Sequence, residues 1–130
     1  MSESQWDPYV RDCHTRQLLD RIGDRWTVLI IGTLQAGPLR FSQIARQVDG
    51  VSQKMLTQTL RALENDGLVT RTVFAEVPPR VEYELTPLGL TLREPLKALE
   101  EWATANMSQV LAARNRNTKQ DLTEPILANV

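Results

Sequence analysis

The stretch FSQIARQVDGVSQKMLTQTLRALENDGLVTRTVFAEVPPRVEY, residues 41–83, decides the fold of this chain. It begins with two short amphipathic segments, at 41–48 and 53–65, which are separated by a Gly-containing turn. Two runs that alternate apolar and polar residues follow, at 68–73 and 81–85, and they are typical of half-buried strands. Helix, turn, helix and hairpin in this order predict a winged helix-turn-helix, which is a mainly α fold with a small β-hairpin (α+β).

The second of these helices has Ser52 as its expected N-cap and is predicted to bury one face. That face consists of Leu56, Leu60 and Leu63. The outer face carries five side chains that can donate hydrogen bonds: Gln53, Lys54, Thr57, Gln58 and Arg61. A helix fits the major groove, where Gln can pair with adenine and Arg or Lys with guanine, and the helix start at Ser52 suits a phosphate. We therefore expect this helix to read DNA, with a merely solvated polar face as the alternative.

The loop 75–80 joins the two strands and contains Pro78-Pro79 followed by Arg80. An arginine held by a stiff hairpin tip can enter a narrow minor groove, where the potential is most negative. The loop is therefore the expected wing, although an ordinary exposed hairpin arginine is the alternative. Arg40 and Arg71 lie at strand edges, where we expect either a phosphate contact or a structural ion pair.

Two helices are predicted before this stretch. The first covers 13–21 and ends at Gly23, and Asp24 is a good N-cap for the second, which covers 25–35. Helical spacing gives the second helix a core face made of Trp26, Leu29, Ile30, Thr33 and Leu34. Residues 39–40 are expected to form a short strand.

After the hairpin, Thr86 as N-cap and Pro87 at the first helical position predict a helix over 87–114, broken near Gly89 and Pro95. Its apolar stripe is longer than a small domain needs, so we expect part of it to form a two-fold dimer. Packing entirely within the monomer, against Trp26 and the first helix, is the alternative. The expected dimer residues are Leu92, Leu96, Leu99 and Trp102. Such a dimer would place two DNA-reading helices roughly 34 Å apart on palindromic double-stranded DNA.

These elements make residues 1–114 a single domain that includes the terminal dimerisation helices, and residues 115–130 a flexible C-terminal tail. The chain has 130 residues, of which 42% are hydrophobic and 24% charged, as in a soluble globular protein. There is no apolar run of ~18 residues and no apolar leader, so we expect neither a membrane span nor secretion. A single cysteine agrees with a cytoplasmic protein.

The formal net charge is −1, but residues 39–81 carry six Lys or Arg against four acids. The positive surplus therefore lies in the expected DNA-reading segment. Because it is small, it favours a specific binder with a few placed cations over a non-specific polyanion binder.

Cys13 is the only cysteine and lies near the expected start of a helix, a position that lowers the pKa of a thiol. It could be a redox or electrophile sensor, and a buried inert thiol is the alternative. His14 is the only histidine, so no His-based metal cluster or catalytic triad can be assembled. We expect no cofactor, no metal and no enzymatic activity.

From Cys13 to about Met107 the chain resembles the HxlR-type (MarR-like) winged-helix transcription regulators. The resemblance rests on LLDRIGDRWTVLIIGTL after the cysteine, on GPLRFSQIARQVDGVSQKMLTQTLRALENDGLVTR and on VPPRVEYELTPLG. It implies a homodimer built through the N- and C-terminal helices, with DNA read by the 53–65 helix and the wing. It also implies a sensor at Cys13 for quinones, aldehydes or oxidants. With no second cysteine in the chain, the modified state would be a thiol adduct or a Cys13–Cys13 bridge between subunits.

Together these features predict a homodimeric, sequence-specific DNA-binding repressor whose affinity falls when Cys13 is modified. Two alternatives remain. One is a regulator of the same fold that binds a small molecule in an apolar pocket near Trp26 and Trp102, with Cys13 inert. The other is a protein-interaction module that does not bind DNA.

Overall fold

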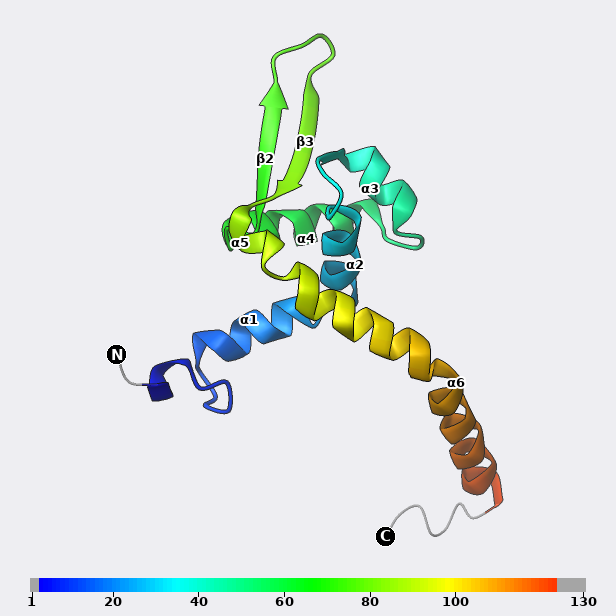
Figure 1. Cartoon of the computed structure of the whole chain (residues 1–130). Helices are drawn as coiled ribbons and strands as arrows, with labels where there is room; N and C mark the ends of the chain where they lie inside the picture. Colours follow the sequence, from blue (N-terminus) through cyan, green and yellow to red (C-terminus); the bar gives the residue numbers. More distant parts are fainter. Residues whose placement is uncertain (1–2, 124–130) are drawn as a thin grey trace. The chain divides into compact units, whose positions relative to one another are not determined.

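The computed structural model describes residues 3–123 and is mainly helical (Figure 1). The elements in chain order are η1 (Glu3–Trp6), α1 (His14–Ile22), α2 (Arg25–Thr33), β1 (Leu39–Arg40), α3 (Phe41–Gln47), α4 (Gln53–Asn65), β2 (Val69–Phe74), β3 (Arg80–Leu85), α5 (Pro87–Leu90) and α6 (Arg93–Thr123). The chain divides into two compact units, Met1–Leu96 and Lys97–Val130, with the boundary inside α6. Along residues 3–123, none of the helices is both long enough and apolar enough to cross a membrane.

The predicted helix-turn-helix is confirmed as α3 and α4. The hydroxyl of Ser52 accepts a hydrogen bond from the backbone N–H of Met55 at 3.0 Å, which fixes the start of α4. Beyond the end of α4, Gly67 has a φ of +75°, a conformation that glycine adopts without steric cost. These two local signals explain why the predicted bounds of α4 agree with the structure.

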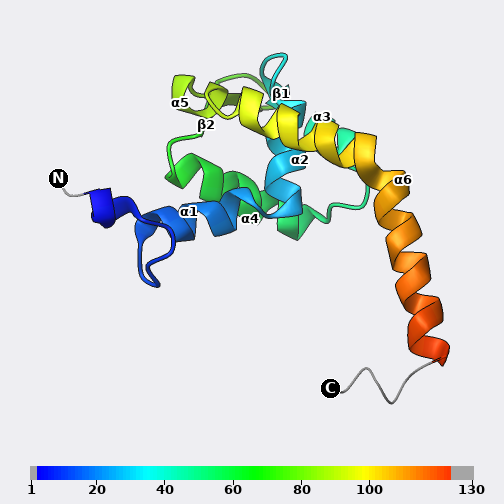
Figure 2. The same ribbon diagram turned by 60° about the horizontal axis from the view of Figure 1, so that its bottom comes forward.

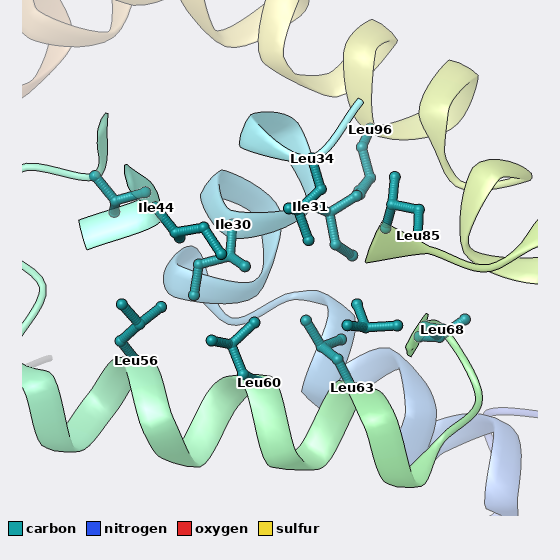
Figure 3. Packing of buried hydrophobic residues seen from close by; sticks show 12 residues of the cluster. Ile30, Ile31, Leu34, Ile44, Leu56, Leu60, Leu63, Leu68, Leu85 and Leu96 are labelled. Carbon is teal, nitrogen blue, oxygen red and sulfur yellow. The ribbon is translucent and has the colours of Figure 1, made fainter. Parts of the chain in front are cut away.

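The core lies between α2, α3 and α4, and the predicted inner face of α4 is confirmed. Figure 3 shows Leu56, Leu60 and Leu63 projecting from one side of α4 toward the apolar side chains of α2 and α3. All three leucines are fully buried, as are Ile30 and Ile44 opposite them. Because α2 packs against both α3 and α4 (Figure 2), it fixes the angle between the two helices of the motif.

The predicted core face of α2 is partly wrong. Its buried side is formed by Thr27, Ile30, Ile31 and Leu34, whereas Leu29 is 46% exposed. Residues 26–34 are apolar on nearly every side of the helix, so their spacing contains little contrast from which a face can be chosen.

The sheet has three strands in the order β1-β3-β2, and both pairs are antiparallel. The predicted hairpin is therefore correct but incomplete, since β1 adds to its β3 edge. In Figure 1 the hairpin projects from the helices, with the 75–79 loop at its outer end. On one sheet face Val69 and Leu85 are paired and buried, and the next pair outward on that face is Arg71 with Tyr83.

Thr86 joins the two ends of the hairpin by hydrogen bonds, next to the end of α4. Its hydroxyl donates to the carbonyl of Gly67 at 2.6 Å and accepts from the N–H of Gly89 at 3.0 Å, while its own N–H donates to the carbonyl of Leu68 at 3.0 Å. Gly89 is buried so closely against Leu68 that a Cβ atom there would overlap the Leu68 carbonyl oxygen. The base of the hairpin is thus held by a compact set of contacts.

The predicted helix over 87–114 is two helices in the structure. The break falls at residues 91–92, between α5 and α6, while Pro95 lies in the first turn of α6, where proline is tolerated. The chain expected to become irregular at Asn115 is helical as far as Thr123. The rest of the predicted tail lies outside the described residues.

Candidate nucleic-acid interface

The polar side of α4 faces away from the buried leucines, and most of it is exposed. Gln53, Lys54, Gln58 and Arg61 are exposed, whereas Thr57 is half-buried. Ser52, at the start of the helix, is also exposed. Five of the six predicted contacts of this helix are therefore open to solvent, and the sixth, Thr57, is partly open.

These side chains border three different grooves. Gln53 lines a groove with Phe41 and Arg46 of α3. Thr57 and Arg61 line another with β2 and β3. Gln58 lies on the opposite flank, in a groove that α4 forms with α1 and α2. The stripe expected from spacing is thus divided into a flank next to the sheet and a flank next to the N-terminal helices.

Arg80 is engaged within the hairpin and does not stand at its tip. It is the first residue of β3, its guanidinium lies 4.0 Å from the ring centroid of Phe74, and it forms ion pairs with Glu76 at 3.3 Å and Glu82 at 3.4 Å. Its Nε makes no hydrogen bond, so the contact with Glu82 is a charge contact without directed geometry. Arg80 also lies on the sheet face opposite to that of Arg71, because they pair with Phe74 and Tyr83 respectively.

Cys13 is the N-cap residue of α1 and is only 6% exposed. Its thiol donates a hydrogen bond to the carbonyl of Gln5 at 3.3 Å. Burial raises the pKa of this thiol, but the nearby Thr15 hydroxyl and the backbone N–H groups of Thr15 and Arg16 favour the thiolate, and the net effect lowers the pKa. Cys13 therefore combines a lowered thiol pKa with cover from the segment that precedes it.

The four predicted dimer residues separate into two pairs. Leu96 is 6% exposed and belongs to the hydrophobic core, and Leu92 packs against that core. Leu99 and Trp102, in the second unit, are 55% and 61% exposed. The first pair therefore stabilises its own chain, and only the second pair presents apolar surface that a partner could cover.

Comparison with known proteins identifies the family. Residues 21–111 match the HxlR-like helix-turn-helix family, and the chain belongs to it. The HTH-type transcriptional regulator YtfH of Escherichia coli is 45% identical over 107 residues, which cover 82% of this chain and 85% of that protein.

Two solved structures are similar across most of the chain. The structure of ytfH from Salmonella typhimurium has 44% sequence identity and a TM-score of 0.79, and the match covers 84% of this chain and 97% of that one. The redox regulator HypR in its reduced form has 37% identity and a TM-score of 0.70, covering 75% of this chain and 97% of that one.

The family and the structural likeness confirm several predictions. The fold is a winged helix-turn-helix in which α3 and α4 form the motif and the β2–β3 hairpin forms the wing. The protein is a DNA-binding transcriptional regulator of the HxlR type and not an enzyme.

The sequence left the role of Arg71 undecided. The missing information was the pairing register, which puts Arg71 opposite Tyr83 on the face shared with Val69 and Leu85. Arg71 thereby joins Arg61 in one groove, while Arg80 is directed to the other face.

Proposed function

We propose that the protein is a cytoplasmic, homodimeric repressor that binds a palindromic operator with α4 in the major groove. The observation that carries this proposal is the exposed polar side of α4, which lies opposite three fully buried leucines. The buried leucines fix the helix to the domain, so the positions from which the outer side chains project are rigid, as base recognition requires. The α4 residues assigned to DNA are Ser52, Gln53, Lys54, Thr57, Gln58 and Arg61.

The wing adds a contact through Arg80 near the minor groove. Because Arg80 is paired with Glu76 and Glu82 in the free protein, DNA binding must exchange these carboxylates for a phosphate or a base edge. Both ion pairs are partly solvated, so the exchange costs little. The wing contact is therefore expected to add less affinity than the contacts of α4.

Dimerisation rests on Leu99 and Trp102, whose exposed apolar surface suits burial against a second copy of the chain. A two-fold dimer matches a palindrome, since each α4 then reads one half-site, with a spacing of about 34 Å.

Modification of Cys13 releases the operator in this proposal. The lowered pKa of the thiol supports this role, as does the similarity to a redox regulator, HypR. Reaction with an oxidant or a quinone would break the contact with Gln5 and uncover the start of α1. The modified state is a thiol adduct or a Cys13–Cys13 bridge between subunits.

The test of DNA reading begins with selection of operator sequences from random duplexes by the wild-type protein. Gln58→Ala should then lose about 1–3 kcal/mol of discrimination at one base position. Gln109→Ala, an exposed glutamine on α6, serves as the matched control and should select the wild-type sequence. The proposal is excluded if the wild-type protein enriches no sequence.

The test of regulation uses the same operator in a gel shift with diamide or benzoquinone. The wild-type complex should dissociate, whereas the Cys13→Ser complex should persist. Release of the Cys13→Ser protein by the same reagents would remove the sensor role and leave control by a small-molecule ligand as the alternative.

A further inference from the structure

A groove between α4 and the sheet gathers two arginines from distant parts of the sequence. It is lined by Thr57, Arg61 and Glu64 of α4, by Arg71 of β2 and by Tyr83 of β3, and it encloses about 400 Å³. Arg71 reaches this groove because it lies on the sheet face that continues outward from the buried Val69–Leu85 pair.

Within residues 5–119, neither arginine is paired with an acid. Among residues 5–119, ion pairs form between Arg21 and Asp66, between Arg80 and both of its neighbouring glutamates, and between Lys97 and Glu101, but none involves Arg61 or Arg71. The structural ion pair considered for Arg71 is therefore not formed. Two guanidinium groups that share a groove repel each other, and an anion bound by both would relieve this repulsion.

We propose that this groove is a subsite for one phosphodiester of the DNA backbone, held by Arg61 and Arg71. This inference rests on the proposed function, since it concerns the same DNA-binding surface. Arginine suits the task because its planar donors match phosphate oxygens. Arg61 and Arg71 then set the position of α4 on the duplex, and base reading falls to the other polar residues of the helix.

Glu64 opposes this contact from within the groove. Its carboxylate is exposed and forms no ion pair with either arginine, so an incoming phosphate meets it as a like charge. Phosphate binding therefore works against Glu64, and removing its charge should strengthen DNA binding. A variant without the Glu64 charge is therefore expected to have a higher DNA affinity than the wild-type protein.

The experiment measures the affinity for the selected operator from low to high NaCl. Each phosphate contact contributes about 0.9 to the slope of log affinity against log salt, so Arg71→Gln should reduce the slope by about this amount. The loss should be about tenfold at low salt and equal for operator and random DNA, because a phosphate carries no sequence information. Glu64→Gln should bind both DNAs severalfold more tightly than the wild-type protein.

Two variants serve as controls. Arg71→Lys keeps the positive charge and should retain most of the wild-type slope, which separates loss of a phosphate contact from damage to the fold. Arg11→Gln makes the same charge change at an exposed position before α1 and should leave the slope unchanged. The unfolding midpoint of each variant is measured alongside.

Replacing single operator phosphates by neutral methylphosphonates locates the contact. At one position per half-site, the substitution should weaken the wild-type complex but not the Arg71→Gln complex. If the wild-type protein binds the operator while Arg71→Gln keeps its slope, the phosphate subsite is wrong and the proposed function stands. If the wild-type protein binds no DNA, the proposed function fails first.

A free anion is the other possible source of a phosphate group. Titration of inorganic phosphate into the DNA-free wild-type and Arg71→Gln proteins separates the two sources. Phosphate binding that is lost in Arg71→Gln, together with an Arg71→Gln salt slope for DNA equal to that of the wild-type protein, would assign the groove to a free anion and overturn the backbone subsite.

Discussion

Among the glycines, Gly89 is the one around which the fold leaves least room. It is buried, and an added Cβ would overlap the carbonyl oxygen of Leu68, which is backbone and cannot rotate away. Gly89→Ala must therefore displace α5 from the base of the hairpin. We expect a loss of about 1–3 kcal/mol in the free energy of unfolding, measured by urea denaturation.

Gly32 provides the matched control for this substitution. It lies within α2, is exposed, and an added Cβ there meets nothing within 4 Å. Gly32→Ala should stabilise the protein by about 0.5–1 kcal/mol, because alanine loses less backbone entropy in a helix. Equal effects at the two positions would contradict the close approach at Gly89.

The reactivity of Cys13 should depend on pH in a direction set by its environment. Only the thiolate reacts, and although burial raises the pKa of Cys13, the Thr15 hydroxyl and the N–H groups of Thr15 and Arg16 lower it overall. The rate of alkylation by iodoacetamide should therefore rise through a midpoint below that of a cysteine in an unstructured peptide. Thr15→Val removes the hydroxyl donor and should move the midpoint upward; an unchanged midpoint would show that this hydroxyl does not favour the thiolate.

Access to Cys13 was not predictable from its neighbours in sequence. The helix start that activates the thiol is a local feature, and the sequence indicates it. The cover over the thiol comes from Gln5 and depends on how the irregular segment 7–12 turns back. Such a turn has no periodic signal.

Among the helices, α4 has the most clearly encoded bounds. Its N-cap can be tested with Ser52→Ala, which removes the acceptor for the Met55 N–H and should cost about 1 kcal/mol in unfolding free energy. Ser52→Asp keeps an acceptor and should retain most of the stability. If Ser52→Ala unfolds like the wild-type protein, the hydroxyl does not cap the helix in solution.

The sequence predicts an element well where its signals are local. Helix α4 has an N-cap, a glycine after its end and a strong apolar stripe, so its bounds and inner face were predictable. The pairing of β1 with β3 is non-local, because two helices and a strand lie between Leu39 and Tyr83 in the sequence. Helix α6 passes Asn115 because the following residues contain no glycine or proline to stop it before Thr123.

At the candidate site, the same difference between local and non-local signals applies. The polar side of α4 follows from helical spacing, so its residues were predictable. Arg71 and Arg80 lie on opposite faces of the sheet, and this difference depends on strand alternation and on the pairing register. Glu82 lies two residues after Arg80 and therefore on the same sheet face, and this proximity was a readable indication of their ion pair.

At the scale of the whole molecule, the apolar surface of the second unit should determine oligomeric state. Trp102→Glu places a charge where we expect a partner to bury an indole, and it should shift sedimentation from dimer to monomer. The affinity for the operator should also fall, because each monomer then binds DNA through a single α4 helix. Thr104→Glu adds a charge on the opposite side of the same helix and should remain dimeric.

The sedimentation of Trp102→Glu can also contradict the expected dimer contact. If Trp102→Glu sediments like the wild-type protein, Trp102 lies outside the dimer contact. The buried Leu96 is unsuitable for this test, because replacing it would damage the core of its own chain.

The hydrogen bonds of Thr86 hold the two ends of the wing hairpin together at its base. Residues 67 and 86 are joined by a hydrogen bond from one hydroxyl, so the chain leaves and re-enters the helical part at almost the same point. Extra residues in the 75–79 loop would lengthen the arm without separating its two ends, and the entropy of loop closure grows only slowly with length. Members of such a family could therefore vary the reach of the wing through insertions at its tip, while the helices beneath keep one arrangement.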